Sequence, residues 1–418
     1  MVNAFSSIRA LRCLTCQRDY TLGPMLEGCP DCQAAGRLAI LDPVYSLGIA
    51  ESTALRAAGA GRLWDFHQLL PVPGRSSVVT LGEGATPLLP LPQAAQETGA
   101  EQVWVKYEAV NPTHSFKDRA NAVAVSMAVH FGFSKVMCTS TGNHGVALAA
   151  YAARAGLRCL VLLPPGTPSA AAQESRFFGA DVVTVDGDVV ALMTQLWQEH
   201  GWYISQRNAP GVGGRPFGNP FGMEGYKTIA YEIFHQLGGR APDCVLLPVG
   251  GGDGAWGVFK GFGELQRLGL TAWMPQIIAC QSAAGASLLR AWRENLSHVE
   301  PVATSPTIAF SIVDRQSGDH ALIALRRSGG RAVAVDDAAL RTAEDLLGKS
   351  GLCVEPSSAA SLAGLRVLAR EDACLAGKSV VLIATGTGLR WPATFDGISR
   401  TPRKVRGSVS ALGCVVEL

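Results

Sequence analysis

The stretch Cys244-Val-Leu-Leu-Pro-Val-Gly-Gly-Gly-Asp-Gly254 joins a short apolar run directly to a cluster of glycines. Such a run is typical of a strand buried on both faces of a parallel sheet. The glycines free backbone N–H groups where a helix is expected to begin, and a helix N-terminus of this kind binds phosphate. No Lys-Ser/Thr pair follows, so the Walker pattern is excluded, and the spacing does not fit a dinucleotide fingerprint. The stretch therefore predicts a phosphate-binding turn between a strand and a helix.

Short apolar runs that alternate with helical stretches continue along the chain on both sides of this turn. Strands are expected at residues 103–107, 135–140, 157–164, 180–186, 244–250, 276–280, 332–335 and 379–386. Helices are expected at 117–131 and 145–155, with others between the later strands. The alternation predicts an α/β fold with open, mostly parallel sheets and helices on both faces. Ligands bind such sheets at the carboxyl ends of the strands, where the glycine-rich turns of this chain lie.

Length, composition and charge narrow the class of protein. The chain has 418 residues, 48% of them hydrophobic and 17% charged, which indicates two or three units with ample apolar side chains for their cores. The formal net charge is +2 and no basic block stands out, so neither nucleic acid nor an anionic membrane is favoured as a partner. No apolar run approaches the roughly 18 residues of a membrane span, and we find no secretory signal. We expect a cytoplasmic protein that acts on a small molecule.

Two pairs of cysteines set the first forty residues apart. Cys13 and Cys16, then Cys29 and Cys32, form two Cys-X2-Cys pairs, a spacing that predicts a zinc ribbon. Four thiolates leave no open position on the metal, so we expect a structural zinc; a ribbon without metal and a redox pair are the alternatives. The loop between the pairs contains a single arginine, which disfavours a nucleic-acid module. The other seven cysteines are expected to be buried thiols.

Lys117 lies in the segment Asn111-Pro-Thr-His-Ser-Phe-Lys-Asp-Arg119, just after a proline-containing turn. The start of a helix, together with Arg119 if it lies close, lowers the pKa of an amine. A lysine in such a place is a nucleophile toward an aldehyde. Taken alone, the pattern is more typical of a solvated surface lysine.

Two further turns carry polar side chains between a strand and a helix. Ser140-Thr-Gly-Asn-His-Gly145 can hold a carboxylate at a helix N-terminus or simply cap that helix. Ala384-Thr-Gly-Thr-Gly388 has two interpretations. One is that a threonine hydroxyl binds a ring nitrogen of a cofactor held between these turns, and the other is a tight turn with a threonine cap.

Taken together and in this order, the four turns resemble those of the fold-type II pyridoxal-phosphate enzymes, the tryptophan synthase β-like superfamily, and most of all its threonine synthase family. NPTHSFKDR is similar to that family's NPTGSFKDR, and STGNHGVALAAYAARAGL to its STGN helix. NPFGMEGYKTIAYEI, GLCVEPSSAASLAGL and TGTGL are similar to NPxRLEGQKTxAxEI, EPxSAAxxAGL and TGHGL. The resemblance covers residues 80–395 and implies two open, twisted, mostly parallel sheets, a bound pyridoxal 5'-phosphate and a homodimer.

The resemblance also implies a role for each matching position. Lys117 carries the cofactor as a Schiff base and moves protons, Asn143 binds the phenolic oxygen of the cofactor, and Thr385 faces its pyridine nitrogen. The cofactor phosphate is bound by Gly250, Gly251, Gly252, Asp253 and Gly254. The substrate carboxylate is held by Ser140, Thr141 and Gly142, with His144 and His114 on the substrate side.

The chain departs from the family pattern at three positions. Gly222 replaces the arginine that binds the substrate phosphate, His144 follows the Gly-Asn pair in place of threonine, and His114 replaces a glycine. Arg207 and Arg215 lie in the loop before Gly222 and compensate if they turn inward. Losing a bidentate arginine removes the best phosphate clamp.

These departures leave several activities open. The implied reaction is elimination or replacement on O-phosphohomoserine or a related phosphorylated or hydroxylated amino acid. The alternatives are an ammonia-lyase like the serine and threonine dehydratases, a β-replacement synthase of the cysteate synthase type, and a catalytically silent binding protein. The expected units are residues 1–40 with the four cysteines, a large cofactor-binding domain at 41–120 and 215–418, and a small substrate-side domain at 121–214.

Overall fold

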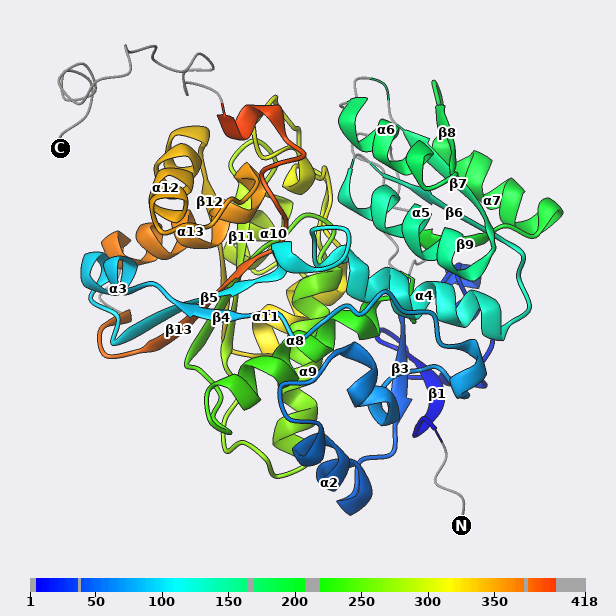
Figure 1. The fold of residues 1–418 in the computed structure, drawn as a ribbon, viewed down its shortest axis with the longest axis horizontal. Coiled ribbons are helices and arrows are strands. Elements are labelled where there is room, and N and C mark those ends of the chain that lie inside the picture. The colour runs from blue at the N-terminus through cyan, green and yellow to red at the C-terminus, as the bar shows by residue number, and fades with distance from the viewer. Residues whose placement is uncertain are drawn as a thin grey trace, which may run out of the picture.

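A computed structural model describes residues 5–36, 39–140, 142–163, 165, 169–206, 219–371 and 375–395. It contains three sheets, arranged as Figure 1 shows. The largest has the order β12 (Arg331–Val335), β11 (Gln276–Ser282), β10 (Cys244–Pro248), β13 (Ser379–Ala384), β5 (Gln102–Tyr107) and β4 (Leu88–Pro90). Its strands are parallel except for β4, which pairs with β5 in the antiparallel direction.

The second sheet is entirely parallel, with the order β8 (Asp181–Thr184), β7 (Arg158–Leu163), β6 (Lys135–Thr139) and β9 (Tyr203–Gln206). The third is a small antiparallel sheet of β2 (Asp19–Tyr20), β1 (Ile8–Cys13) and β3 (Leu41–Tyr45). The two parallel sheets confirm the predicted fold-type II α/β architecture.

Helices cover both faces of the large sheet because its central strands are apolar on both sides. Val245 and Leu247 of β10 pack in one core with helices α8 (Met223–Gln236), α9 (Asp253–Arg267) and α11 (Asp319–Arg327). Cys244 and Leu246 point to the opposite face and pack with α12 (Asp337–Lys349) and α13 (Pro356–Glu371). Alternate side chains of one strand thus enter two different cores, as the two-residue period of a strand requires.

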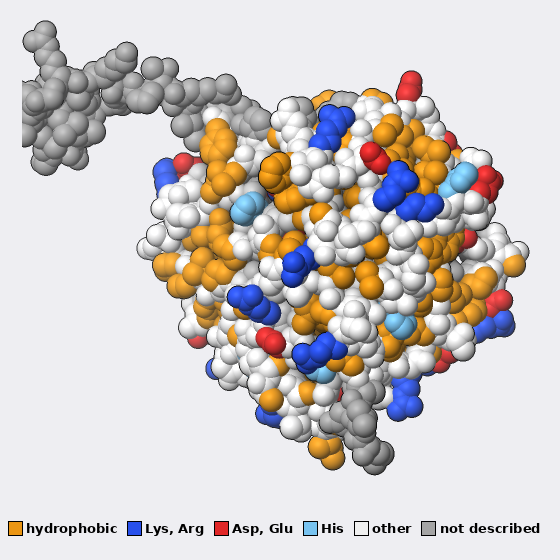
Figure 2. Space-filling model, turned by 45° about the vertical axis from the view of Figure 1, so that its right-hand side comes forward, with side chains coloured by type: hydrophobic (Ala, Val, Ile, Leu, Met, Phe, Trp, Pro, Cys, Tyr) orange, Lys and Arg blue, Asp and Glu red, His pale blue; other side chains and the backbone are white. Residues whose placement is uncertain are grey.

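The remaining helices complete the two layers. The four-stranded parallel sheet, called the small sheet from here on, packs with α4 (Lys117–His130), α5 (Asn143–Ala155), α6 (Ser169–Phe177) and α7 (Val189–His200). The others are α1 (Pro30–Ala34), α2 (Ile49–Ala58), α3 (Pro92–Thr98) and α10 (Ser287–Arg293). No helix among the described residues is both long enough and apolar enough to cross a membrane. On the face shown in Figure 2, lysine and arginine side chains are scattered among neutral and hydrophobic ones and form no continuous basic patch.

The order of the strands brings three distant turns to one edge of the large sheet. Strands β10, β13 and β5 are neighbours, and all three run parallel. The glycine turn at 250–254 follows β10, Thr385 follows β13, and the segment that leads to Lys117 follows β5. Because the carboxyl ends of parallel strands meet at the same edge, these turns are neighbours in space.

A buried cluster of charges anchors the first turn of α4. The Arg119 guanidinium donates through Nε to Glu108 Oε2 at 2.7 Å and through Nη1 to Glu232 Oε1 at 2.5 Å. Lys106 Nζ donates to Glu232 Oε2 at 2.6 Å, and all four side chains are buried. The cluster joins α4 to the end of β5 and to α8.

A second cluster of charges ties the N-terminal sheet to the large sheet. Lys260 of α9 donates to Asp42 Oδ1 of β3 at 2.9 Å and to Glu224 Oε1 of α8 at 2.7 Å. Trp256 Nε1 donates to the same Asp42 oxygen at 2.8 Å. The cysteine-containing sheet is therefore held against the helix that follows the glycine turn.

Replacing Arg119 with methionine should be strongly destabilising. The substitution leaves Glu108 and Glu232 buried with one cation, Lys106, in place of two, and breaking a buried pair costs about 3–5 kcal/mol. Denaturant unfolding of the two proteins measures the loss. The control is Arg290→Met, which removes two exposed pairs, with Glu294 and with Glu300, and should change the unfolding free energy by less than about 1 kcal/mol. Equal losses in the two variants would contradict this account.

Candidate active site

One cavity lies where the carboxyl ends of the two parallel sheets meet. It brings together most of the residues singled out from the sequence. The cavity is lined by Lys117, Ser140, Gly142, Asn143, His144, Gly250, Gly251, Gly252, Asp253, Gly254 and Thr385, with Phe116, Gln206, Ser311, Asp314 and Glu355 among the others.

Lys117 is the first residue of α4. Its side chain is half-buried, and its amine lies beside the rings of Phe116 and Tyr226. Burial lowers the pKa of the amine, while the nearby carboxylates of Asp253, Asp314 and Glu355 act in the opposite direction. Arg119 takes no part, because its guanidinium turns away into the ionic cluster with Glu108 and Glu232. The lowered pKa was expected, but its cause is burial and not the arginine.

The loop before Lys117 is held by its own side chains. Asp118 Oδ2 accepts a hydrogen bond from the Thr113 N–H at 2.8 Å, and Oδ1 accepts one from the Thr113 hydroxyl at 2.6 Å. The backbone N–H of Phe116 donates to the carbonyl of Thr385 at 2.8 Å. These bonds lock the start of α4 against the turn that follows β13.

The glycine turn at 250–254 forms a cradle of backbone donors. Within the described residues, the N–H groups of Gly251, Gly252 and Asp253 donate to no protein acceptor. Gly252 has φ 110°, a conformation open to glycine, and a Cβ there would lie 2.6 Å from Ala321 Cβ. Free N–H groups at the start of the 15-residue helix α9 suit a phosphate.

Asp253 is the one acidic residue in this cradle. Its Oδ1 lies 3.0 Å from Nε2 of the buried His320 on α11. The carboxylate therefore has a hydrogen-bonding partner on the side of α11, which reduces its repulsion of an anion at the glycine N–H groups. No local sequence pattern predicts this contact, because the two residues are 67 positions apart.

Asn143 stands at the start of α5 between two charged side chains. Its Oδ1 accepts a hydrogen bond from Arg390 Nη1, and its Nδ2 donates to Glu355 at 3.0 Å. Burial raises the pKa of Glu355 to about 7. Thr385 also lines the cavity, and its Oγ1 lies 2.9 Å from the hydroxyl of Ser358.

His144 is enclosed in hydrogen bonds. Nε2 lies 3.0 Å from Ser205 Oγ, Nδ1 lies 3.4 Å from Asn121 Nδ2, and the Ser205 hydroxyl donates to Asn121 Oδ1. Burial, followed by the charge of Lys117, lowers the pKa of the imidazole well below its ordinary value. His144 is therefore a neutral side chain whose two nitrogens already have protein partners.

The other substrate-side positions differ from one another. Ser140 Oγ accepts hydrogen bonds from the N–H groups of Gly142 and Gly145, so it supports the turn before α5. Thr141 lies outside the described residues. The His114 side chain is exposed and is not among the residues lining the cavity, and its backbone has φ 63°.

Gly222 lies directly beneath α4. A Cβ at this position would lie 3.3 Å from the carbonyl oxygen of Ala120 and 3.4 Å from Ala124 Cβ. Helix α4 therefore lies where a longer side chain at residue 222 would have to begin. Arg207 and Arg215, the two arginines that might replace the missing one, lie outside the described residues.

Sequence reasoning missed four side chains at or next to the cavity, namely Asp314, Glu355, Arg390 and His320. Burial raises the pKa of Asp314 to about 6. Glu355 and Arg390 stand within or directly after stretches already singled out, EPSSAASLAGL and TGTGL, so their position was an available signal. Asp314 had a weaker one, a single acid after the run Ile308-Ala-Phe-Ser-Ile-Val313.

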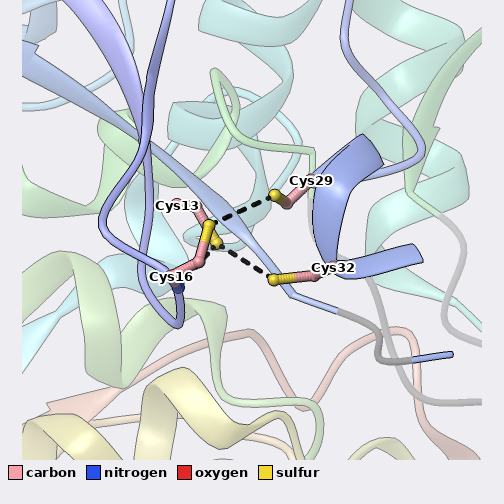
Figure 3. Close-up of side chains that lie close together, drawn as sticks. All are labelled: Cys13, Cys16, Cys29 and Cys32. Atoms are coloured by element: carbon pink, nitrogen blue, oxygen red, sulfur yellow. Dashed lines mark hydrogen bonds between the residues drawn. The ribbon is translucent and has the colours of Figure 1, made fainter. Parts of the chain in front are cut away.

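The four N-terminal cysteines lie together, away from the cavity, with their side chains pointing toward one another (Figure 3). The four sulfur atoms lie within 4.8 Å of one another, with Cys13–Cys32 at 3.8 Å and Cys16–Cys29 at 3.7 Å. Tetrahedral zinc with Zn–S bonds of about 2.3 Å requires sulfur separations of about 3.8 Å. Burial alone would raise the pKa of Cys29, but hydrogen bonds from Tyr20 and the neighbouring thiols lower it to about 7.

The backbone at residue 114 yields a test that does not depend on any ligand. A side chain at positive φ costs about 1 kcal/mol, so His114→Gly should be more stable than His114→Ala by about that amount. His130, exposed at the end of α4, is the control, where alanine should exceed glycine. Thermal and denaturant unfolding measure the stability of the four variants. If alanine is more stable than glycine at both positions, residue 114 carries no such strain.

Comparison with known proteins agrees with this geometry. Residues 79–386 match the family described as Pyridoxal-phosphate dependent enzyme. The chain is 34% identical over 416 residues to a threonine synthase of Methanocaldococcus jannaschii, covering 97% of this chain and 99% of the relative. It is 37% identical over 336 residues to a threonine synthase of Synechocystis, covering 79% of this chain and 84% of the relative.

Solved structures share the fold at lower identity. Maize serine racemase superposes with a TM-score of 0.64 at 17% identity, covering 82% of this chain and 94% of that one. Diaminopropionate ammonia lyase from Escherichia coli superposes with a TM-score of 0.63 at 20% identity, covering 82% and 89%. The family match, the identity to threonine synthases and the shared architecture lead to one conclusion: this chain belongs to the pyridoxal-phosphate-dependent enzymes, in the threonine synthase family.

Proposed function

We propose that this enzyme eliminates or replaces a leaving group on an amino acid in the manner of a threonine synthase, with O-phosphohomoserine or a related phosphorylated or hydroxylated amino acid as its substrate. The observation that carries the proposal is that Lys117, the glycine cradle, Asn143 and Thr385 line one cavity. These groups supply an amine, phosphate donors, an amide and a hydroxyl, which together fit a phosphorylated pyridine aldehyde.

Pyridoxal phosphate, held through Lys117, supplies an electron sink that acidifies the Cα–H bond of an amino acid. The free N–H groups of Gly251, Gly252 and Asp253 would bind its phosphate, and Asn143 Nδ2 would donate to its phenolic oxygen. Thr385 would face the ring nitrogen. A neutral hydroxyl does not require that nitrogen to be protonated, so the ring is a milder electron sink, which suits elimination and replacement.

Lys117 would also move the protons of the reaction. Because burial lowers the pKa of its amine, a larger share of the amine is neutral near pH 7 than for a solvated lysine, and only the neutral form accepts a proton. The turn at Ser140, Thr141 and Gly142 would hold the substrate carboxylate at the N-terminus of α5. His144, neutral and already paired, would shape the pocket rather than carry charge.

A second candidate is an ammonia-lyase like the serine and threonine dehydratases, or a β-replacement synthase of the cysteate synthase type. Two observations favour it. Gly222 packs against α4 in place of the family's arginine. In the described part of the cavity wall, Lys117 is the one lysine or arginine, whereas Asp253, Asp314 and Glu355 are acidic. With one cation among its described side chains, such a wall offers a second phosphate little electrostatic stabilisation and suits loss of water or ammonia.

The decisive experiment combines cofactor trapping with a substrate panel. Borohydride reduction of the reconstituted protein followed by peptide mass spectrometry should find the label on Lys117, and Lys117→Ala should lose about 10²–10⁴-fold in turnover. O-phosphohomoserine, O-phosphoserine, serine and threonine are then offered separately. Phosphate and threonine formed from the first support the threonine synthase reaction, whereas keto acid from serine or threonine supports the ammonia-lyase. A protein that takes up no cofactor contradicts both.

We propose in addition that Cys13, Cys16, Cys29 and Cys32 bind one structural zinc ion. The sulfur separations support this assignment, because four thiolates at these distances suit tetrahedral zinc. The four positions would be filled by protein, so the metal would stabilise the antiparallel sheet of β1, β2 and β3 and leave catalysis to the cavity.

Metal analysis tests the zinc assignment. The purified protein should contain one zinc per chain, and Cys32→Ser should reduce zinc content and lower the melting temperature. Cys353→Ser changes a described cysteine outside the cluster and should keep the metal. Zinc below about one tenth of an equivalent in protein purified and refolded with zinc present would rule the assignment out.

We further propose the division into residues 1–40, 41–120 with 215–418, and 121–214. All strands of the small sheet fall in the last range and all strands of the large sheet in the second, which supports it, although β3 at Leu41–Tyr45 pairs with β1 of the first. The family resemblance supports a homodimer, which analytical ultracentrifugation tests, and a cytoplasmic enzyme.

A further inference from the structure

Arg390 is a buried arginine next to the cavity, with 6% of its surface exposed. Its Nε and Nη2 donate to the two carboxylate oxygens of Glu174 at 2.6 and 2.8 Å. Nη2 also donates to the carbonyl of Thr113 at 3.0 Å, and Nη1 donates to Asn143 Oδ1. One guanidinium thus joins helix α6, the loop before Lys117 and the start of α5.

These contacts fix the orientation of the Asn143 amide. A guanidinium only donates, so the amide atom that faces Arg390 must be the carbonyl oxygen. The NH2 group then lies on the opposite side, where Nδ2 is 3.2 and 3.0 Å from the two carboxylate oxygens of Glu355. One N–H directed between these two oxygens makes both contacts. The second N–H remains for an acceptor in the cavity that Asn143 lines. A flipped amide would place NH2 against the guanidinium and lose both hydrogen bonds.

We propose that Arg390 is a positioning residue that holds Asn143 with an N–H group directed at the phenolic oxygen of the cofactor. The inference rests on the proposed contact between Asn143 and that oxygen. A donated hydrogen bond stabilises an anionic oxygen relative to its protonated form. Arg390 would thereby set the protonation state of the bound cofactor without touching it.

A direct role in binding an anionic substrate is disfavoured by two observations. The charge of Arg390 is matched in a bidentate pair by Glu174, and Arg390 is not among the described residues that line the cavity. The planar guanidinium of Arg390 donates to three segments at once, and this geometry holds the Asn143 amide. A lysine cannot reproduce it.

The test is spectroscopic and uses the full-length reconstituted enzyme. In Arg390→Leu, the pH midpoint between the visible and ultraviolet absorbance bands of the bound cofactor should rise by about one unit. Affinity for pyridoxal phosphate, measured by fluorescence titration, should fall about tenfold. Arg390→Lys should show a smaller spectral shift than Arg390→Leu. Glu174→Gln, which keeps the bond from Arg390 to Asn143, should show little shift.

A double-mutant cycle identifies the route of the effect. In an Asn143→Ala background, Arg390→Leu should add no further spectral shift, because the amide through which Arg390 acts is gone. The matched control is Arg366→Leu, which removes a partly buried arginine paired with Glu97 and should leave the spectrum unchanged.

The result that would overturn the proposal is a lowered melting temperature in Arg390→Leu with an unchanged pH midpoint, since that would show a structural role alone. A shift that persists in the Asn143→Ala background would overturn it as well. If Arg390→Leu does not fold, the same comparison between Arg390→Lys and its combination with Asn143→Ala decides. Borohydride trapping on Lys117 in the unsubstituted enzyme separates failure of this inference from failure of the proposed function.

Discussion

The position of Lys117 depends on the buried cluster around Arg119. Arg119 stands two positions after Lys117, and its guanidinium has partners, Glu108 and Glu232, from the end of β5 and from α8. Charges in such a place stabilise a fold only when every partner is present and well oriented. The cluster therefore fixes the direction in which α4 leaves the large sheet, and with it the direction in which Lys117 enters the cavity.

Helix α8 packs closely against both α4 and α9, the helix that begins at the phosphate-binding turn, because glycines lie at both contacts. A Cβ on Gly225 of α8 would collide with the backbone carbonyl of Arg119, and one on Gly257 of α9 would lie 2.6 Å from Tyr226 Cβ of α8. The backbone of α8 therefore lies close to the backbones of both α4 and α9. Because α4 begins with Lys117 and α9 begins at the glycine turn, their common neighbour α8 sets the spacing between amine and phosphate donors. Gly222 belongs to the same packing, so the arginine of the family pattern would disturb this spacing as well as add a charge.

The sequence predicted the parts of this arrangement that depend on local pattern. Apolar runs ending in glycine or Ser/Thr turns located β6, β10 and β13, and Lys117 was placed at the start of a helix that begins at that residue. Five strands were not predicted, namely β1, β2, β3, β4 and β9. Two of them carry weak patterns: β3 contains Asp42, whose charge is matched by Lys260 from 218 residues away, and β4 is a three-residue edge strand. Contacts between distant segments, such as Asp253 with His320, have no local signature. The role assigned to His114 rested on its place in the motif NPTHSFKDR, but its side chain is exposed and its backbone has a positive φ.

The two parallel sheets meet through side chains that are themselves parts of the site. Asn143 and Glu174 belong to helices packed with the small sheet, whereas Glu355 and Arg390 follow the large sheet's helix α12 and strand β13. The hydrogen bonds among these four side chains cross from one sheet to the other beside the cavity. Any movement of the small sheet relative to the large one must therefore stretch or break bonds to Asn143. Ligand geometry and the relative position of the sheets are coupled for this reason, since the amide that would contact the cofactor is also a link between them.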